Sequence, residues 1–426
     1  MRTIAAATAE GKGSRPSPRW AMAPRWVTAL SAAAAAALLG LALGSFLTYS
    51  DTPTVPLPTV VVPPDDAVRA LQADAQAAPE DPRRWQLLAV AATQQAIATA
   101  DPVWYAVAGN AFDRALTLDP DNAFTEVARG QLLLSLHDFH DALLLGQEVT
   151  EALPATADAW GVLVDAQVEL GRYDQAAESL QTMLDLRPDL PALARAAYLR
   201  QLHGDLDGAI LAMRQADLAA AGVSADASAV AGLLGDLLLQ RGDLEQAEHA
   251  YRRASTASAA AGLARIAAAR GDLDRAEMIL LELSRRSPVP AVLTALAEVQ
   301  ARLNDTDGLA RTVQLARSLA TLQQDAGQVV DLELALFEAS FGDPGRAVEL
   351  AEAAYAARPD NVYAAGALAW ALHRTGQGDR ARQLAVQATR LGTVDTPHEL
   401  RMAAITGDGI EALRDRNPNA WELYLP

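Results

Sequence analysis

The chain has 426 residues, of which 51% are apolar and only 5% aromatic, and it contains no cysteine, which excludes disulfides, thiolate metal sites and cysteine nucleophiles. Its 35 basic and 53 acidic residues give a net charge of −18, and five of the basic residues lie within the first 25. The remainder is therefore more acidic still, and because such a surface repels a phosphate backbone we expect no nucleic-acid binding.

The first two segments predict a membrane anchor. Residues 1–26 are basic, and residues 27–48 begin with 21 residues without a charge, VTALSAAAAAALLGLALGSFL. As a helix this run spans about 31 Å, close to the roughly 30 Å of the hydrocarbon core of a bilayer. Basic residues before it and Asp51 after it favour a cytoplasmic N-terminus, with the rest of the chain outside the cytoplasmic membrane.

Three interpretations of this apolar run stay open. A retained single-span anchor is favoured, since the run is longer than the roughly 7–15 residues of a signal-peptide core. A signal peptide cleaved near Ala42-Leu43-Gly44 would give a secreted protein, and an alanine-rich segment that stays in the cytoplasm is the third interpretation. Residues 49–66 follow as a linker, in which five prolines favour an extended spacer.

The last segment, 67–426, is expected to form one array. From about residue 82 its sequence repeats a unit of helix, turn and helix with a period of about 34 residues. The turn position holds Gly171, Gly204, Gly242, Gly271, Gly342 and Gly376, usually followed by aspartate. Glycine enters the left-handed backbone region after a helix without a Cβ penalty, and the aspartate can cap the next helix.

Two further positions recur with the turn. Alanine follows each glycine by five residues, where two helices are expected to cross closely, and proline ends the second helix in several copies. The alanines are Ala176, Ala209, Ala247, Ala276, Ala347 and Ala381, and the prolines are Pro120, Pro154, Pro188, Pro288 and Pro359.

About nine copies are present, and their irregularities also carry predictions. The first copy is interrupted near residues 97–106, so longer helices or a larger loop are expected there. The step from Gly242 to Gly271 is short, and Asn304 replaces the turn glycine in the seventh copy. After Gly392 the pattern decays into what we interpret as a C-terminal cap that includes Trp421, Leu423 and Tyr424.

The copy at residues 157–190 resembles the tetratricopeptide repeat, whose characteristic positions are met by Trp160, Leu163, Val164, Gly171, Ala176 and Pro188. The resemblance implies an all-α fold, a right-handed α-solenoid of about nine helix-turn-helix repeats, preceded here by one N-terminal transmembrane or signal helix. It also implies a long concave surface without an enclosed pocket. Blocks 331–343 and 367–393 are similar to uncharacterised exported or membrane-anchored tetratricopeptide proteins of high-GC bacteria, which implies an envelope location.

Chemistry-bearing motifs are missing from the sequence. His137 and His140 could share a metal, but His137 and Asp138 fall on the repeat turn, so architecture explains the cluster and we predict no metal site. The sequence has no phosphate loop, nucleophile elbow or kinase signature. We therefore expect no enzyme activity, no cofactor and no small-molecule substrate.

The predicted function is a scaffold that binds a protein or peptide in the concave groove, as part of an envelope complex. By the family's pattern the first helix of each repeat lines this groove, and its large polar or aromatic positions are Asp165, Tyr198, Gln201, Asp236, Arg265, Glu298, Tyr363, Trp370 and His373. Aromatic and charged side chains suit peptide recognition, and acidic edges favour a basic partner. The alternative is an accessory or structural subunit of a membrane transporter or enzyme complex, whose chemistry lies in the partner.

Overall fold

A computed structural model of the protein describes residues 65–220, 224–330 and 332–425, and in these ranges the chain forms helices and no strand. The first half contains α1 (Asp65–Ala77), α2 (Pro82–Thr99), α3 (Val103–Leu118), α4 (Ala123–Ser135), α5 (Phe139–Ala152), α6 (Ala157–Glu169), α7 (Tyr173–Leu186), α8 (Leu190–Leu202), α9 (Leu206–Ala219), α10 (Ser224–Gln240) and α11 (Leu244–Tyr251). The second half contains α12 (Ala257–Ala269), α13 (Leu273–Arg286), α14 (Pro290–Leu303), α15 (Thr306–Asp325), α16 (Leu332–Phe341), α17 (Pro344–Ala357), α18 (Val362–Arg374), α19 (Gly378–Ala388), α20 (Thr396–Thr406), α21 (Ile410–Arg416) and α22 (Ala420–Leu423).

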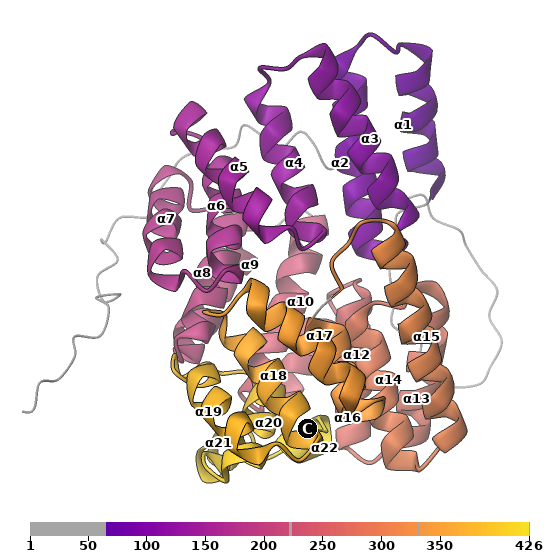
Figure 1. The fold of residues 1–426 in the computed structure, drawn as a ribbon, viewed down its shortest axis with the longest axis vertical. Coiled ribbons are helices and arrows are strands. Elements are labelled where there is room, and N and C mark those ends of the chain that lie inside the picture. Colours follow the sequence, from indigo (N-terminus) through magenta and orange to yellow (C-terminus); the bar gives the residue numbers. More distant parts are fainter. Residues whose placement is uncertain (1–64, 221–223, 331, 426) are drawn as a thin grey trace, which may run out of the picture. The chain divides into compact units, whose positions relative to one another are not determined.

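Consecutive helices pair as hairpins (Figure 1). Within the described residues α2 to α19 make nine such hairpins, α1 packs on α2, and α20 to α22 follow them. The expected irregularities are also present: α2 extends over 18 residues where the first copy is interrupted, and α11 has only 8, which accounts for the short step between Gly242 and Gly271. The repeat pattern thus predicted the helical array and the places where it departs from regularity.

The turns explain why glycine and aspartate recur. At Gly204 the backbone is left-handed, with φ of +81°, and the N–H of Asp205 donates to the carbonyl of Arg200 at 2.8 Å, which closes the end of α8. The Asp205 carboxylate accepts from the N–H of Gly208 at 2.9 Å and so caps α9. Positive φ is also found at Gly171, Gly242, Gly271, Gly376, Asn304 and His137. The predicted left-handed turn is confirmed at these positions.

Gly342 is the exception, because its φ lies outside the left-handed region. Pro344 follows two residues later, and it restricts Asp343 to the extended conformation that the structure shows. The N–H of Asp343 then donates to the carboxylate of Glu338 at 2.9 Å, where the regular turns use a backbone carbonyl. The prediction of a left-handed glycine was therefore wrong at this copy.

Small residues allow the helices to approach closely. The six alanines that follow the turn glycines by five residues are all fully buried, as predicted. The second helices α3, α5, α7, α13 and α17 each end two residues before a proline, which cannot continue a helix. The core is accordingly a continuous series of small clusters rather than one large centre.

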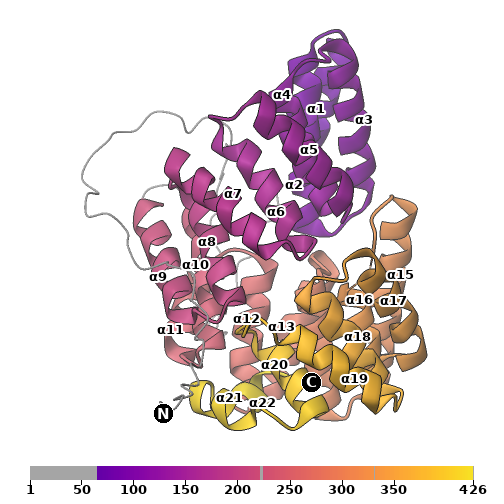
Figure 2. The same cartoon turned by 60° about the vertical axis from the view of Figure 1, so that its left-hand side comes forward.

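A series of hydrogen bonds between described residues joins positions that lie 189 to 193 apart in the sequence. The series begins with the Ser287 hydroxyl on the carbonyl of Ala98 and ends with the Thr393 hydroxyl on the carbonyl of Leu202. Such regular separation means that the helical array completes one superhelical turn in about 190 residues and that the second turn rests on the first. In Figures 1 and 2 the late orange and yellow helices accordingly lie against the earlier ones.

The two turns touch through backbone. At Gly171, an added Cβ would lie 2.7 Å from the backbone nitrogen of Asn361 and closer still to the carbonyl of Asp360. At Gly204 it would lie 2.8 Å from the carbonyl oxygen of Gly392. The turn within a hairpin therefore packs against the loop between two later hairpins. Between the two turns the chain leaves a partly open cavity, which is consistent with the expected absence of an enclosed pocket.

The predicted membrane segment, 27–48, lies outside the described residues. Among the helices that the structure does describe, none is both long and apolar enough to cross a bilayer.

Candidate functional site

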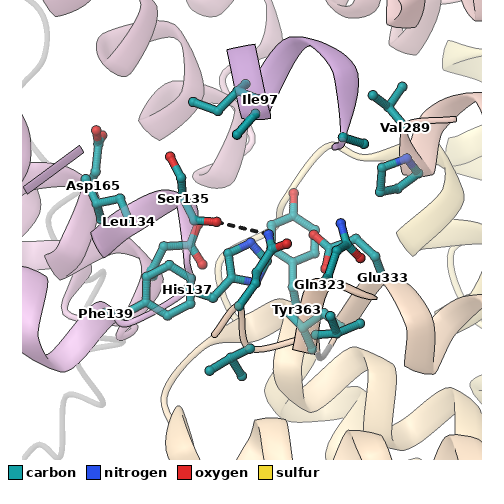
Figure 3. Close-up of a pocket in the computed structure, with 18 of the residues that line it drawn as sticks. Ile97, Leu134, Ser135, His137, Phe139, Asp165, Val289, Gln323, Glu333 and Tyr363 are labelled. Atoms are coloured by element: carbon teal, nitrogen blue, oxygen red, sulfur yellow. Dashed lines mark hydrogen bonds between the residues drawn. The ribbon is translucent and has the colours of Figure 1, made fainter. Parts of the chain in front are cut away.

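The inter-turn cavity is a partly open pocket with a volume of about 720 Å³ (Figure 3). It is lined by residues of α2 to α6 and α8 in the first superhelical turn, and by the start of α12 and residues from α14 to α18 in the second. Its walls come from helix ends and connecting loops as well as from inner helices. Ligand sites for small molecules and short segments typically have volumes of about 300–1,000 Å³. The cavity is thus large enough to hold a ligand.

Large apolar side chains are left accessible inside this cavity. Ile97, near the end of α2, keeps 54% of its surface accessible, and Val329 on the loop before α16 keeps 51%. Leu134, Val289 and Pro290 line the same space. Covering such surface stabilises a complex by roughly 25 cal/mol per Å² of apolar area. The interior therefore offers apolar area that the chain itself does not cover.

Two tyrosines place hydroxyl groups in the cavity. Tyr198 is 37% accessible although protein surrounds it, and among the described residues its hydroxyl makes no hydrogen bond. The Tyr363 hydroxyl reaches Asp395 at 3.5 Å. Burial raises the pKa of both hydroxyls, with a further rise from the Glu169 carboxylate at Tyr198 and from Asp395 at Tyr363. Both therefore stay protonated at neutral pH, and the Tyr198 hydroxyl, which has no acceptor among the described residues, can donate to a ligand.

Carboxylates outnumber guanidinium groups among the residues that line the cavity. The Asp165 carboxylate on α6 accepts from the Arg195 guanidinium on α8 at 2.8 Å, and Glu169 pairs with Arg358 at 2.8 Å across the two turns. Glu333, at the start of α16, is exposed to the cavity and has no ion pair within the described residues. A cationic group of a ligand is the natural counterpart of this carboxylate.

The nine predicted groove residues separate into four places. Asp165, Tyr198 and Tyr363 line the inter-turn cavity, whereas Gln201 donates to the carbonyl of Val394 at 2.9 Å and so joins the two turns. Trp370 is buried in the core of α16 to α20, where its indole donates to Ser340, and His373 stacks on its ring. The remaining three are Asp236, Arg265 and Glu298.

Those three residues form a second polar group on the inner helices α10, α12 and α14. Arg265 pairs with Glu298 at 2.8 Å, and both side chains are largely buried. Burial raises the pKa of the Glu298 carboxyl, against the opposing effect of Arg265. Asp236 accepts from the Tyr251 hydroxyl at 2.7 Å, and incomplete solvation raises its pKa to about 6 although Tyr251 and Arg265 favour the ionised form.

Several cavity residues were missed by sequence reasoning. Gln323, Gln328 and Glu333 come from the end of α15, the following loop and the start of α16. Gln328 donates to the carbonyl of Ser135 at 3.0 Å, the bond drawn in Figure 3, and Ile97 extends from the irregular end of α2. These residues lie where the repeat is interrupted or lengthened. Departures from the repeat period were therefore the only feature of the sequence that could have indicated them.

The histidine cluster is part of a turn. His137 has a φ of +61°, its ring stacks on Phe139, and Asp138 caps α5. Among the residues that the structure describes, no group of three His, Asp or Glu side chains could hold a metal ion.

Fold and site together define a helical repeat protein whose second superhelical turn rests on the first and leaves a partly open cavity between them. Two family models, both described as tetratricopeptide repeat, match the chain, one at residues 339–397 and the other at residues 127–191 and 233–289. These three segments, which together make up less than half of the chain, therefore match tetratricopeptide repeats, which generally mediate contacts between proteins.

Two proteins similar to this chain are also described as tetratricopeptide repeat proteins. Tetratricopeptide repeat protein 33 of Mus musculus is 34% identical over 82 residues, which is 19% of this chain and 31% of the relative. The chain thus matches about a third of the length of that relative. The crystal structure of a tetratricopeptide repeat protein from Parabacteroides merdae aligns with 57% of this chain and 97% of its own, at 13% identity and a TM-score of 0.39.

Proposed function

We propose that this chain is a non-enzymatic scaffold that receives a segment of a protein partner in the inter-turn cavity. The observation that carries the proposal is the combination of accessible apolar side chains with the Tyr198 hydroxyl donor inside a cavity of about 720 Å³. A folded chain normally buries such apolar area and pairs such donors, so their availability indicates a ligand.

The lining determines the chemistry of the segment. Ile97 and Val329 fit an apolar anchor, and the Tyr198 hydroxyl can donate to a backbone carbonyl of the ligand. Glu333 adds a negative charge without a partner within the described residues, which favours a lysine or arginine beside the anchor. The expected ligand is therefore a short basic and apolar segment.

Cross-linking inside cells tests this proposal. Because the chain has no cysteine, a single cysteine can be introduced at Tyr198, or on the outer face at Leu211 of α9 as the matched control, and coupled to a photoactivated cross-linker. A discrete adduct is expected from position 198 and not from position 211, and Glu333→Arg should weaken it. Equal capture from both positions would refute binding in the cavity.

The location of the scaffold is part of the same proposal. Residues 27–48 would anchor the array outside the cytoplasmic membrane, in an envelope complex, with a secreted protein after signal cleavage as the alternative. A phosphatase fused after Pro64 should be active if this point lies outside the cytoplasm. An inactive but stable fusion would remove the exported location and leave the binding function untouched.

Two other functions have specific support. The volume of the cavity also suits a small amphiphilic molecule with a cationic head, which native mass spectrometry of the protein purified from cells would reveal as a bound mass. An accessory or structural subunit is the other candidate, and the acidic surface of the array supports it by favouring a basic partner. In that case a transporter or enzyme subunit should be recovered with the chain whether or not the cavity is blocked by Ile97→Trp.

A further inference from the structure

The C-terminal segment, Asn417–Leu425, does not lie on the outside of the last hairpin but reaches the inner helices of the middle of the array. Leu423 is 2% exposed and Tyr424 is 8% exposed, and both belong to the apolar cluster built by α8 to α12. Helix α22 packs against α12, far away in the sequence. The segment therefore occupies part of the concave surface of its own array.

The contacts resemble those of a bound peptide. The guanidinium of Arg265 on α12 lies 5.1 Å from the centre of the Tyr424 ring, a cation–π distance. Arg302 on α14 donates to the backbone carbonyl of Glu422 at 2.5 Å, and the backbone N–H of Leu425 points to the Glu298 carboxylate. Side chains of two inner helices thus hold the main chain of the segment and one aromatic ring.

The backbone conformation agrees with this comparison. Helix α22 has only four residues, and at Tyr424 the chain is extended, with φ of −136° and ψ of 149°. Contacts to the main chain of a bound segment, with a pocket for one aromatic side chain, are the way in which groove-binding domains hold linear peptides. Packing between two helices of a repeat would use side chains on both sides.

The segment also covers the charged part of the predicted groove. Arg265 and Glu298 contact the segment directly. Burial raises the pKa of the Tyr424 hydroxyl, and the carboxylate of Asp236, which accepts from the Tyr251 hydroxyl, lies close enough to raise it further. A partner that used these groove residues would have to displace residues 423–425 first. The inter-turn cavity touches α12 and α14 only at their first residues, Ser258 and Pro290, whereas the segment contacts Arg265, Glu298 and Arg302 further along these helices.

We propose that the inner face of α12 and α14 is a docking site for a segment that leaves a short helical turn and becomes extended at a tyrosine between two leucines, and that residues 423–425 are its resident occupant. A partner carrying such a segment binds by taking the place of the chain's own. The isolated chain is therefore self-inhibited at this site.

A labelled peptide with the sequence of residues 417–426, NPNAWELYLP, tests the proposal on full-length chains by fluorescence anisotropy. The unchanged protein should bind it at least tenfold more weakly than the Tyr424→Ala variant, whose own segment is released. Adding Arg302→Ala to that variant should weaken the binding again by fivefold or more, since the peptide carbonyl loses its donor. A peptide with alanine in place of the tyrosine should bind neither chain.

Trp421→Ala is the matched control. Trp421 belongs to the same segment but is 36% exposed and lies against Arg414, away from Arg265 and Glu298. This variant should bind the peptide as weakly as the unchanged protein. If Tyr424→Ala keeps its helical circular dichroism and still binds no peptide, the segment is only a structural cap and the proposal is wrong.

Hydrogen exchange on the unchanged protein gives an answer even if Tyr424→Ala fails to fold. The N–H groups of Leu423 and Tyr424 donate to the carbonyls of Asn419 and Ala420. A displaceable segment should exchange these amides at least tenfold faster than the interior amides of α20. Equally slow exchange in both would mean that the segment leaves only when the whole array unfolds, which would overturn the proposal.

Discussion

Gly171→Ala should destabilise the chain more than Gly376→Ala, although the two glycines occupy the same position of their repeats. Their φ values are +75° and +80°, so an alanine meets the same left-handed strain at both. At Gly376 nothing lies within 4 Å of the added Cβ, whereas at Gly171 it collides with the backbone of Asp360 and Asn361. The difference between the two variants therefore isolates the contact between the superhelical turns.

The expected magnitudes follow from these two effects. Left-handed strain in a residue with a Cβ costs about 1–2 kcal/mol, which is the whole expected loss for Gly376→Ala. Overpacking against backbone that cannot rotate away adds about 1–3 kcal/mol at Gly171, for a total of about 2–5 kcal/mol. Gly204→Ala meets Gly392 and should resemble Gly171→Ala, and Gly271→Ala, with open space, should resemble Gly376→Ala.

Two measurements decide the matter. Urea unfolding gives the loss of free energy, and small-angle X-ray scattering gives the radius of gyration, which should rise for Gly171→Ala if the collision separates the turns. The reasoning is refuted if all four variants lose the same free energy and keep the same radius.

Three further predictions concern single side chains. Glu298→Gln should lower the free energy of unfolding in urea by about 3–5 kcal/mol, because it leaves Arg265 buried without a countercharge. The double variant Arg265→Met, Glu298→Leu should recover most of this loss, and no recovery would contradict the explanation. Because the pKa of Asp236 is raised to about 6 in the folded chain from 3.8, its contribution to stability is complete below pH 3.8 and is lost as the pH rises through 6. The unfolding temperature of Asp236→Asn, relative to the unchanged protein, should therefore rise between pH 4 and pH 7, and a constant difference would be evidence against the shift. Ile97→Ala should change stability by no more than about 0.5 kcal/mol, whereas Leu88→Ala on the same helix, with Leu88 only 2% exposed, should cost about 2–5 kcal/mol; equal losses would mean that Ile97 is packed.

Local features of the fold could be predicted from the sequence because each depends on a few neighbouring residues. The left-handed turn at Gly204, its cap at Asp205 and the crossing at Ala209 lie within six positions, and they recur at the repeat period. The failure at Gly342 is also local, since Pro344 changes the backbone of the residue before it. These elements needed no knowledge of the superhelix.

The closure of the superhelix could not be predicted in the same way. The N–H of Val394 donates to the carbonyl of Gln201, and the Thr393 hydroxyl donates to the carbonyl of Leu202. Backbone carbonyls are present at every residue, so these contacts leave no trace in the sequence. The pitch depends on small rotations that add up over several hairpins, including the short α11 and the 20-residue α15.

The candidate site was therefore only partly predictable. Asp165, Tyr198 and Tyr363 were found because the first helix of every repeat faces inward. Glu333 and Val329 could not be found, because they face the cavity only once the second turn lies on the first. Trp370 was predicted from its repeat position to face the groove, but neighbouring helices bury its ring and its indole donates to Ser340. Position in the repeat therefore does not show whether a large ring is accessible to a partner.

Residues that hold the two superhelical turns together also line the inter-turn cavity. Glu169, Arg358 and Asn361 line the cavity, and the same three form ion-pair and hydrogen-bond contacts between the turns. A ligand that contacts them binds the closed form better than the open form, so it must favour closure by the same free energy. Gly171→Ala, which disfavours closure, should then weaken cross-linking from position 198, whereas Gly376→Ala should not. If both variants cross-link like the unchanged chain, the ligand binds the array without regard to its closure.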